Sequence, residues 1–323
     1  MLKAYSSVSG HLEPHDGAPE DFADAIWLDL LSPTREEERA VEDGLGLSVP
    51  TRADMEEIEV SSRLYAEDGT YFMTAILPAY TDADDTEMAP ITFVLSGDHL
   101  ITIRYHDPQA FRTFATRTQR ADVGCTDSET VLIGLLETIV DRLADVLERA
   151  GGDIDTLSHD IFQRPDNRKA PKADFNATLK ALGRKGDLNS KIRDSLVTLE
   201  RLSGYLGHVT LQRASNRDIR DRVKTLGRDI RSLADHANFL SQKITFLLDA
   251  TLGMINIEQN GIIKIFSVAA VIFLPPTLIA SIYGMNFAIM PELHWAFGYP
   301  LAIGLMVASA GGTFFYFKRR GWL

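Results

Sequence analysis

The chain has 323 residues, with 45 acidic and 33 basic side chains and a formal net charge of −12. Residues 1–125 contain 24 acidic and 9 basic side chains, so the negative charge is concentrated there. This distribution excludes nucleic acid as an expected partner, because phosphate binding needs a basic surface. The acidic excess either serves solubility or attracts cations.

The single cysteine, Cys125, excludes an intramolecular disulfide, as expected in a reducing compartment. The N-terminal sequence, MLKAYSSVSGHLEPHDG, contains no apolar core of signal-peptide length. We therefore expect the N-terminal region to stay in the cytoplasm.

Residues 1–125 are predicted to form an acidic α/β cytoplasmic domain. The segment 25–30 is typical of a strand, and 34–46 of a short helix with Glu in its first turn and Gly at its end. Two strand pairs follow, with turns centred on Gly69 and Gly97. We find no glycine-rich phosphate loop in this region.

The motif HLEPHD, at 11–16, offers side chains of the kind that bind transition metals. Because Pro14 interrupts the motif, we interpret it as a solvated loop rather than a metal site. The side chains concerned are His11, Glu13, His15 and Asp16.

Residues 126–261 are predicted to form a helical hairpin and a long stalk helix. Apolar residues recur at helical spacing from Asp127, and again after Asp174. A third helix, from Asp218 to Gln259, carries a heptad seam over four repeats. Such a helix needs partners, either neighbouring helices of the same chain or other copies. The seam comprises Ile219, Val223, Leu226, Ile230, Leu233, Ala237, Leu240, Ile244 and Leu247.

Two apolar runs follow, at 262–283 and 295–317. The first has one charge, Lys264, near its start, and the second has none. Each is long enough to cross about 30 Å of hydrocarbon. We predict a transmembrane hairpin; the alternative is a buried helix pair of a soluble protein.

The flanking charges predict the orientation of this hairpin. The tail at 318–323 is basic, whereas the loop at 284–294 has no Lys or Arg. The positive-inside rule then places both chain termini in the cytoplasm and the loop outside, in a multi-pass protein of the inner (plasma) membrane.

Polar and small residues of the first span fall on one stripe, at alternating spacings of four and three. The stripe is either a small-residue seam between helices or a wall that lines water. Two helices cannot enclose a pore, so a water-lined wall would require several copies of the chain. The stripe comprises Asn256, Asn260, Ile263, Ser267, Ala270, Leu274, Thr277 and Ser281.

The oxygen atoms near this stripe suit a hard cation. Pro275 and Pro276 free backbone carbonyls near Val271 and Ile272, and such carbonyls are tolerated in a membrane where protein or water satisfies them. Neutral oxygens offer hydrogen bonds to the water shell of an ion rather than replacing it. This fits Mg²⁺, which dehydrates reluctantly.

The segment YGMNF at 283–287, followed by MPELHWAFGYP at 290–300 and a basic tail ending KRRGWL, closely resembles the CorA family of divalent-cation transporters. The strong match covers about 249–323. The resemblance implies a funnel-shaped homopentamer in the membrane, a magnesium/cobalt channel whose first spans line the pore. It implies that Gly284, Met285 and Asn286 form the selectivity filter for hydrated Mg²⁺, and that Co²⁺ or Ni²⁺ often passes too.

Carried over by position, the resemblance implies a set of pore-lining residues that largely matches the stripe but includes Phe266 in place of Ser267. Asn286 and Thr277 would contact the hydrated ion, Asp249 would stand at the inner mouth, and Glu292 in the external loop would gather cations. The pore-lining residues are Asn260, Ile263, Phe266, Ala270, Leu274, Thr277 and Ser281. Phe266 as a constriction, and the second proline of Pro275-Pro276, depart from what we expect of the family.

The resemblance also implies that cytoplasmic Mg²⁺, bound between protomers, holds the pore closed. Residue spacing does not show which carboxylates would bind this regulatory Mg²⁺. The candidates include Glu56, Glu57, Asp82, Asp84 and Asp85. The sequence has no GxxxxGK[ST] motif and no catalytic constellation, so we expect no ATP-driven pump, no enzyme and no organic cofactor. The membrane potential suffices to drive uptake.

Two other functions remain as alternatives. A ZntB-type zinc transporter is related in fold, although the GMNF and MPEL segments favour magnesium and cobalt. A membrane-anchored sensor or scaffold would use the hairpin only as a tether, with lipid and other copies of itself as its partners.

Overall fold

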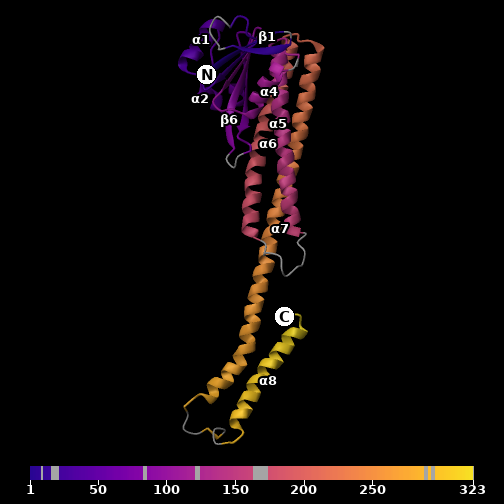
Figure 1. The fold of residues 1–323 in the computed structure, drawn as a ribbon. Helices are drawn as coiled ribbons and strands as arrows, with labels where there is room; N and C mark the ends of the chain where they lie inside the picture. The colour runs from indigo at the N-terminus through magenta and orange to yellow at the C-terminus, as the bar shows by residue number, and fades with distance from the viewer. Residues whose placement is uncertain are drawn as a thin grey trace. The chain divides into compact units, whose positions relative to one another are not determined.

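The computed structural model describes residues 1–8, 10–15, 22–82, 86–120, 124–162, 174–286, 290–291 and 295–322 (Figure 1). The chain divides into two compact units, Met1–Leu248 and Asp249–Leu323. The first unit contains both the sheet and the long helices that we predicted as a separate region. The domain limits that we predicted from the sequence stay a prediction.

The first unit contains a seven-stranded sheet with the order β2-β1-β3-β7-β6-β5-β4. Neighbouring strands are antiparallel except β3 and β7, which are parallel. The strands are β1 (Leu2–Val8), β2 (His11–His15), β3 (Trp27–Leu31), β4 (Leu64–Glu67), β5 (Thr70–Ala79), β6 (Glu87–Ser96) and β7 (His99–Arg104).

Both predicted hairpins are confirmed, and their turns have the backbone angles that tight hairpins need. Asp68 and Gly69 have φ of 48° and 80°, and Gly97 has φ of 54°. Positive φ at these positions lets the turn follow the twist of the strands, and glycine adopts it without steric cost.

The interpretation of HLEPHD as a loop was wrong. His11–His15 form β2, which pairs with β1 at the edge of the sheet. An edge strand tolerates Pro14, because an edge strand pairs on one side only and need not donate from every N–H. Among the described residues no group of three His, Cys, Asp or Glu side chains is placed to hold a metal ion; Asp16 lies outside them.

Helices cover both faces of the sheet. One face packs against α1 (Arg35–Leu45) and α2 (Arg52–Glu56), through a core that includes Val41, Met55 and Ile101. The short α3 (Val60–Arg63) precedes β4. The other face packs against α4 (Gln109–Arg120), α5 (Ser128–Phe162) and α6 (Phe175–Gln212), as Figure 1 shows. Sequence periodicity missed α4, β1 and β2.

The heptad seam lies on α7 (Arg217–Tyr283), and neighbouring helices of the same chain cover it. All of its residues are buried except Leu233, which is half-buried. Gly151 of α5 and Gly186 of α6 lie opposite Leu240 and Ile244, and the Asn189 amide donates to the Ala237 carbonyl at 2.9 Å. The long helix therefore takes its seam partners within the chain, not from other copies.

A buried ion pair joins the two parallel strands at the centre of the sheet. Arg104 Nη2 and Nε donate to Asp29 Oδ2 and Oδ1 at 2.7 and 3.0 Å. The Thr102 hydroxyl also donates to Asp29, and itself accepts from the Trp27 indole. Burial acts to lower the pKa of Arg104, but hydrogen bonds and charge from Asp29 outweigh it and raise that pKa. Burial and the Asp29 charge raise the pKa of Tyr5 to about 12.

Replacing Asp29 by Ala should lower the free energy of unfolding by about 3–5 kcal/mol, because a buried guanidinium loses its main partner. Unfolding by urea, in detergent, would be followed through Trp27 fluorescence in a background with Trp295 and Trp322 changed to Phe. The control is Glu56→Ala, which breaks an exposed pair worth at most about 1 kcal/mol. Equal effects of the two variants would contradict the assignment.

Like charges crowd where α5 meets α7. Burial and the charges of Glu137, Asp145 and Asp229 raise the pKa of Asp141. A raised carboxyl pKa means that ionisation favours the unfolded chain, so stability is lost as pH rises through the folded-state value.

Asp141→Asn should therefore raise the unfolding temperature at pH 7, and the gain should vanish below about pH 3.9, the ordinary carboxyl value. Thermal scans across this pH range would measure it. Glu148→Gln, on the same helix, removes an equal charge that does not act on Asp141 and serves as the control. A gain that persists at low pH would overturn the explanation.

Candidate ion path along α7

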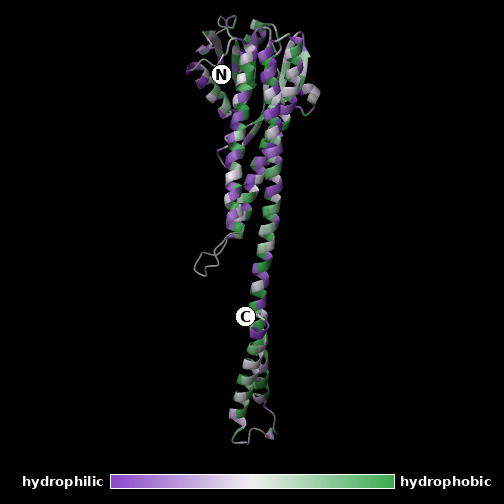
Figure 2. Cartoon of the chain, turned by 90° about the vertical axis from the view of Figure 1, so that its right-hand side faces the viewer, coloured by the Kyte–Doolittle hydropathy of each residue, from purple (hydrophilic) through white to green (hydrophobic). Residues whose placement is uncertain are grey.

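Within the part of the chain that the structure describes, two helices are long and apolar enough to cross a membrane: α7 and α8 (Gly298–Arg319). In the second unit, hydrophobic residues predominate along both (Figure 2). The helix α7 ends at Tyr283, the last residue of the predicted first span. Pro275 and Pro276 lie within the helix and do not end it.

One side of α7 in this unit is covered. Val268 is only 2% exposed, and Lys264, Ile272 and Ile279 are half-buried. A side chain on an isolated helix is not buried to this degree, so we infer that α8 covers this side. On α8 the buried residues are small, Gly298 and Ala302, as expected where two membrane helices approach closely.

The predicted stripe lies roughly opposite this covered side, given about 100° of rotation per residue. Ile263, Phe266 and Leu274 are 61%, 72% and 70% exposed, and the other predicted pore-lining residues are exposed too. Phe266 and Ser267 are both exposed, so the single chain does not distinguish the two rotations of the stripe.

Thr277 lies near the Gly284 end of the stripe, just after the two prolines. Its hydroxyl donates to the Phe273 carbonyl at 2.7 Å. The hydroxyl proton is thus used within the helix, and the lone pairs of the oxygen remain as acceptors on the exposed side. Such an oxygen accepts hydrogen bonds from the water of a hydrated cation.

The tripeptide Gly284-Met285-Asn286 directly follows the last residue of α7. The N–H of Gly284 donates to the Ala280 carbonyl at 2.9 Å, and that of Met285 to Ile282 at 3.3 Å. A Cβ on Gly284 would lie 3.0 Å from the Ala280 oxygen, so a larger residue would strain this helix end. Asn286 follows and is exposed. Glu292 lies outside the described residues.

The other end of the hairpin carries a basic and aromatic cluster. Lys264 Nζ donates to the Gly321 carbonyl at 3.3 Å and lies 5.4 Å from the centre of the Trp322 ring. Arg320 lies over the Tyr316 ring at 5.6 Å. Basic and aromatic side chains gather where a span meets the membrane surface, so this cluster indicates the interface at the Lys264 end.

Of the candidate carboxylates that the structure describes, Asp82 and Glu56 are held by arginines, whereas Glu57 and Asp249 are exposed. Asp249 is exposed on α7, at the start of the second unit. Asp82 is held by Arg142 and Arg149 at 2.8 and 2.7 Å. Burial acts to raise the pKa of Asp82, but these two arginines outweigh it and lower that pKa. Glu56 pairs with Arg52; Asp84 and Asp85 lie outside the described residues.

Comparisons with known proteins agree with these features. Residues 22–319 match the family described as CorA-like Mg2+ transporter protein. The magnesium transport protein CorA of Haemophilus influenzae is 38% identical over 323 residues, which is the full length of both chains. The complete structure of the CorA magnesium transporter from Methanocaldococcus jannaschii matches with a TM-score of 0.79 at 21% identity, covering 100% of this chain and 99% of that one.

The cytoplasmic domain of ZntB from Vibrio parahaemolyticus also matches, with a TM-score of 0.56 at 11% identity, covering 79% of this chain and 97% of that one. This likeness concerns the fold alone. The extent of the family match and the full-length identity decide the assignment: the chain belongs to the CorA-like Mg2+ transporter protein family.

Proposed function

We propose that the chain is a channel-like transporter for Mg²⁺ that works as a homo-oligomer, a pentamer by its family resemblance, and also passes Co²⁺ or Ni²⁺. The observation that carries the proposal is the exposed stripe on α7, which lies opposite the side covered by α8 and leads to Gly284, Met285 and Asn286. Full-length relatives named as magnesium transport proteins support Mg²⁺ as the cargo.

The stripe requires other copies of the chain. Exposed Thr and Ser side chains within a span are costly against lipid, and functional polar residues in membranes face a bundle interior or water. Copies arranged with this side of α7 inward would enclose a path lined by Asn260, Thr277 and Ser281, with Ile263, Phe266 and Leu274 as apolar constrictions.

The path selects its ion by hydrogen bonding to the hydration shell. Neutral oxygens from Thr277 and Asn286 accept hydrogen bonds from ion-bound water and do not replace it. Mg²⁺ holds its water more firmly than Ca²⁺ does, so a ring of such oxygens favours a hydrated Mg²⁺.

The membrane potential drives inward movement. At 100 mV a divalent cation gains about 4.6 kcal/mol on entering, twice the roughly 2.3 kcal/mol per charge. The basic cluster at Lys264, Lys318 and Arg319 supports a cytoplasmic position for this end of the hairpin, in the inner membrane. The loop after Asn286, with Glu292, would then face outside and concentrate cations.

Regulation by cytoplasmic Mg²⁺ completes the proposal. The acidic character of residues 1–125 and the exposed carboxylate of Asp249 supply negative charge that a divalent cation would neutralise between copies. Loss of cytoplasmic Mg²⁺ would leave these charges to repel one another and would favour an open path. The proposal involves no catalytic step and no organic cofactor.

Asn286→Ala should reduce Mg²⁺ uptake into liposomes about tenfold or more, because each copy loses one hydrogen bond to the ion's shell. Asn238→Ala, an exposed site on α7 in the first unit, is the control. Size-exclusion chromatography should show the same oligomer for both variants. Unchanged uptake in Asn286→Ala would favour a tethered sensor or scaffold, and Zn²⁺ uptake without Mg²⁺ uptake a ZntB-type transporter.

Thr277→Val should lower Mg²⁺ flux several-fold without changing stability much. Thr313→Val on α8 is a closely matched control, because the Thr313 hydroxyl makes the same hydrogen bond, to the Ser309 carbonyl at 2.8 Å. Both variants lose one intrahelical hydrogen bond, but only the first removes an oxygen from the stripe. Equal fluxes in the two variants would contradict the assignment of the stripe to the ion path.

A further inference from the structure

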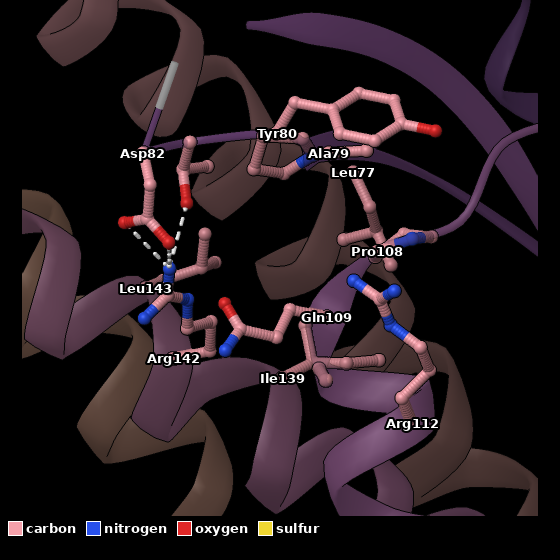
Figure 3. A pocket seen from close by; sticks show the side chains of 13 residues that line it. Leu77, Ala79, Tyr80, Asp82, Pro108, Gln109, Arg112, Ile139, Arg142 and Leu143 are labelled. Carbon is pink, nitrogen blue, oxygen red and sulfur yellow. Dashed lines mark hydrogen bonds and ion pairs between the residues drawn. The ribbon is translucent and has the colours of Figure 1, made fainter.

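A cavity of about 330 Å³ lies in the first unit, beyond the end of β5 and between α4 and α5 (Figure 3). Its floor is aliphatic, with Leu77, Ile139 and Leu143 among the lining residues. Leu77 and Leu143 are buried, and so are Pro78 and Pro108 in the wall. A cavity of this size and character accepts a small organic molecule with an apolar body.

Arg142, which lines this cavity together with Asp82, has a buried donor without a partner among the described residues. Its Nη2 donates to Asp82 at 2.8 Å and to Thr81 at 3.1 Å, whereas its Nε is buried and makes no hydrogen bond to any described residue. A buried N–H without an acceptor costs roughly 1–3 kcal/mol. An acceptor oxygen carried by a ligand would satisfy it.

The rim adds a second positive charge and an aromatic ring. The guanidinium of Arg112 and the amide of Gln109, both from α4, are turned towards the cavity in Figure 3. Among the described residues, the one ion pair of Arg112 is a loose contact with Asp107 at 3.5 Å. Tyr80 stands at the rim, 55% exposed, with φ of 55°. A non-glycine residue with positive φ is strained, and such strain is typical of binding sites.

We propose that this cavity binds a small amphipathic carboxylate, with roughly six to ten carbon atoms in its apolar body. The body lies on the aliphatic floor under the Tyr80 ring. The carboxylate accepts from Arg142 Nε and faces Arg112. Such a ligand ties the end of β5 to α4 and α5, and its binding is independent of the ion path.

The test uses 3-phenylpropionate as the probe, with the full chain in detergent and calorimetry as the readout. The neutral 3-phenylpropanol and the cationic 2-phenylethylamine have similar apolar bodies, and we expect both to bind at least about tenfold more weakly, the loss of one charged hydrogen bond. No binding of the carboxylate, or equal binding of the alcohol, overturns the proposal.

Two arginine variants separate the donor from the ion pair. Arg142→Lys keeps a cation beside Asp82 but removes the Nε donor, so it should weaken binding of 3-phenylpropionate about tenfold. Arg149→Lys alters the other arginine that pairs with Asp82, at 2.7 Å. Because Arg149 does not line the cavity, this variant should leave binding of 3-phenylpropionate unchanged. Equal weakening by both variants would contradict the role of Nε.

A third variant keeps the test decisive if Arg142→Lys does not fold. Arg112→Gln changes a side chain at the rim that is 64% exposed, so we expect the variant to fold. It should weaken binding of the carboxylate and leave the weak binding of the alcohol unchanged. If Arg112→Gln and the unaltered chain bound the carboxylate equally well, the proposed role of the Arg112 charge at the rim would be wrong.

Discussion

In a hairpin of two membrane helices, each helix has one neighbour, which covers only one of its sides. A polar stripe on the other side of α7 would therefore face lipid unless another copy of the chain covers it. In the second unit α8 covers the side that contains Val268, and the side with Asn260 and Thr277 stays exposed. In the first unit the heptad seam of the same helix is already covered by α5 and α6. In the proposed homo-oligomer, contacts between copies along this helix would therefore lie on the stripe and not on the seam.

Arginine pairing organises the acidic first unit. Arg104 neutralises Asp29 inside the sheet, and Arg142 with Arg149 holds Asp82 at its surface. A carboxylate held by two arginines is poorly placed to bind a cation, so a negative sequence is not the same as a cation-binding surface. Two nitrogens of Arg142 have different surroundings: Nη2 donates to Asp82, whereas Nε is buried and has no partner among the described residues.

Features set by local signals could be predicted from the sequence. The hairpins at Gly69 and Gly97 need positive φ, the helix after Asp174 has a side-chain cap, and the heptad seam repeats regularly. Features set by distant partners could not. The strand at His11–His15 exists because β1 pairs with it, and the cavity joins segments from β5, α4 and α5 that are far apart in the chain. For the proposed ion path, spacing predicts a stripe but does not fix its rotation, because Phe266 and Ser267 differ by one residue and are both exposed.

The parallel pairing of β3 with β7 has a consequence for how the chain folds during synthesis. The hydrogen bonds from Arg104 to Asp29 span 75 residues, whereas the hairpins between β4 and β7 are local. The strands β1, β2 and β3 can form their antiparallel pairs early in synthesis. The free edge of β3 stays unpaired until β7 has left the ribosome. During that interval β3 presents unpaired backbone groups and an uncompensated carboxylate, and the charge of Asp29 opposes premature pairing with another nascent chain.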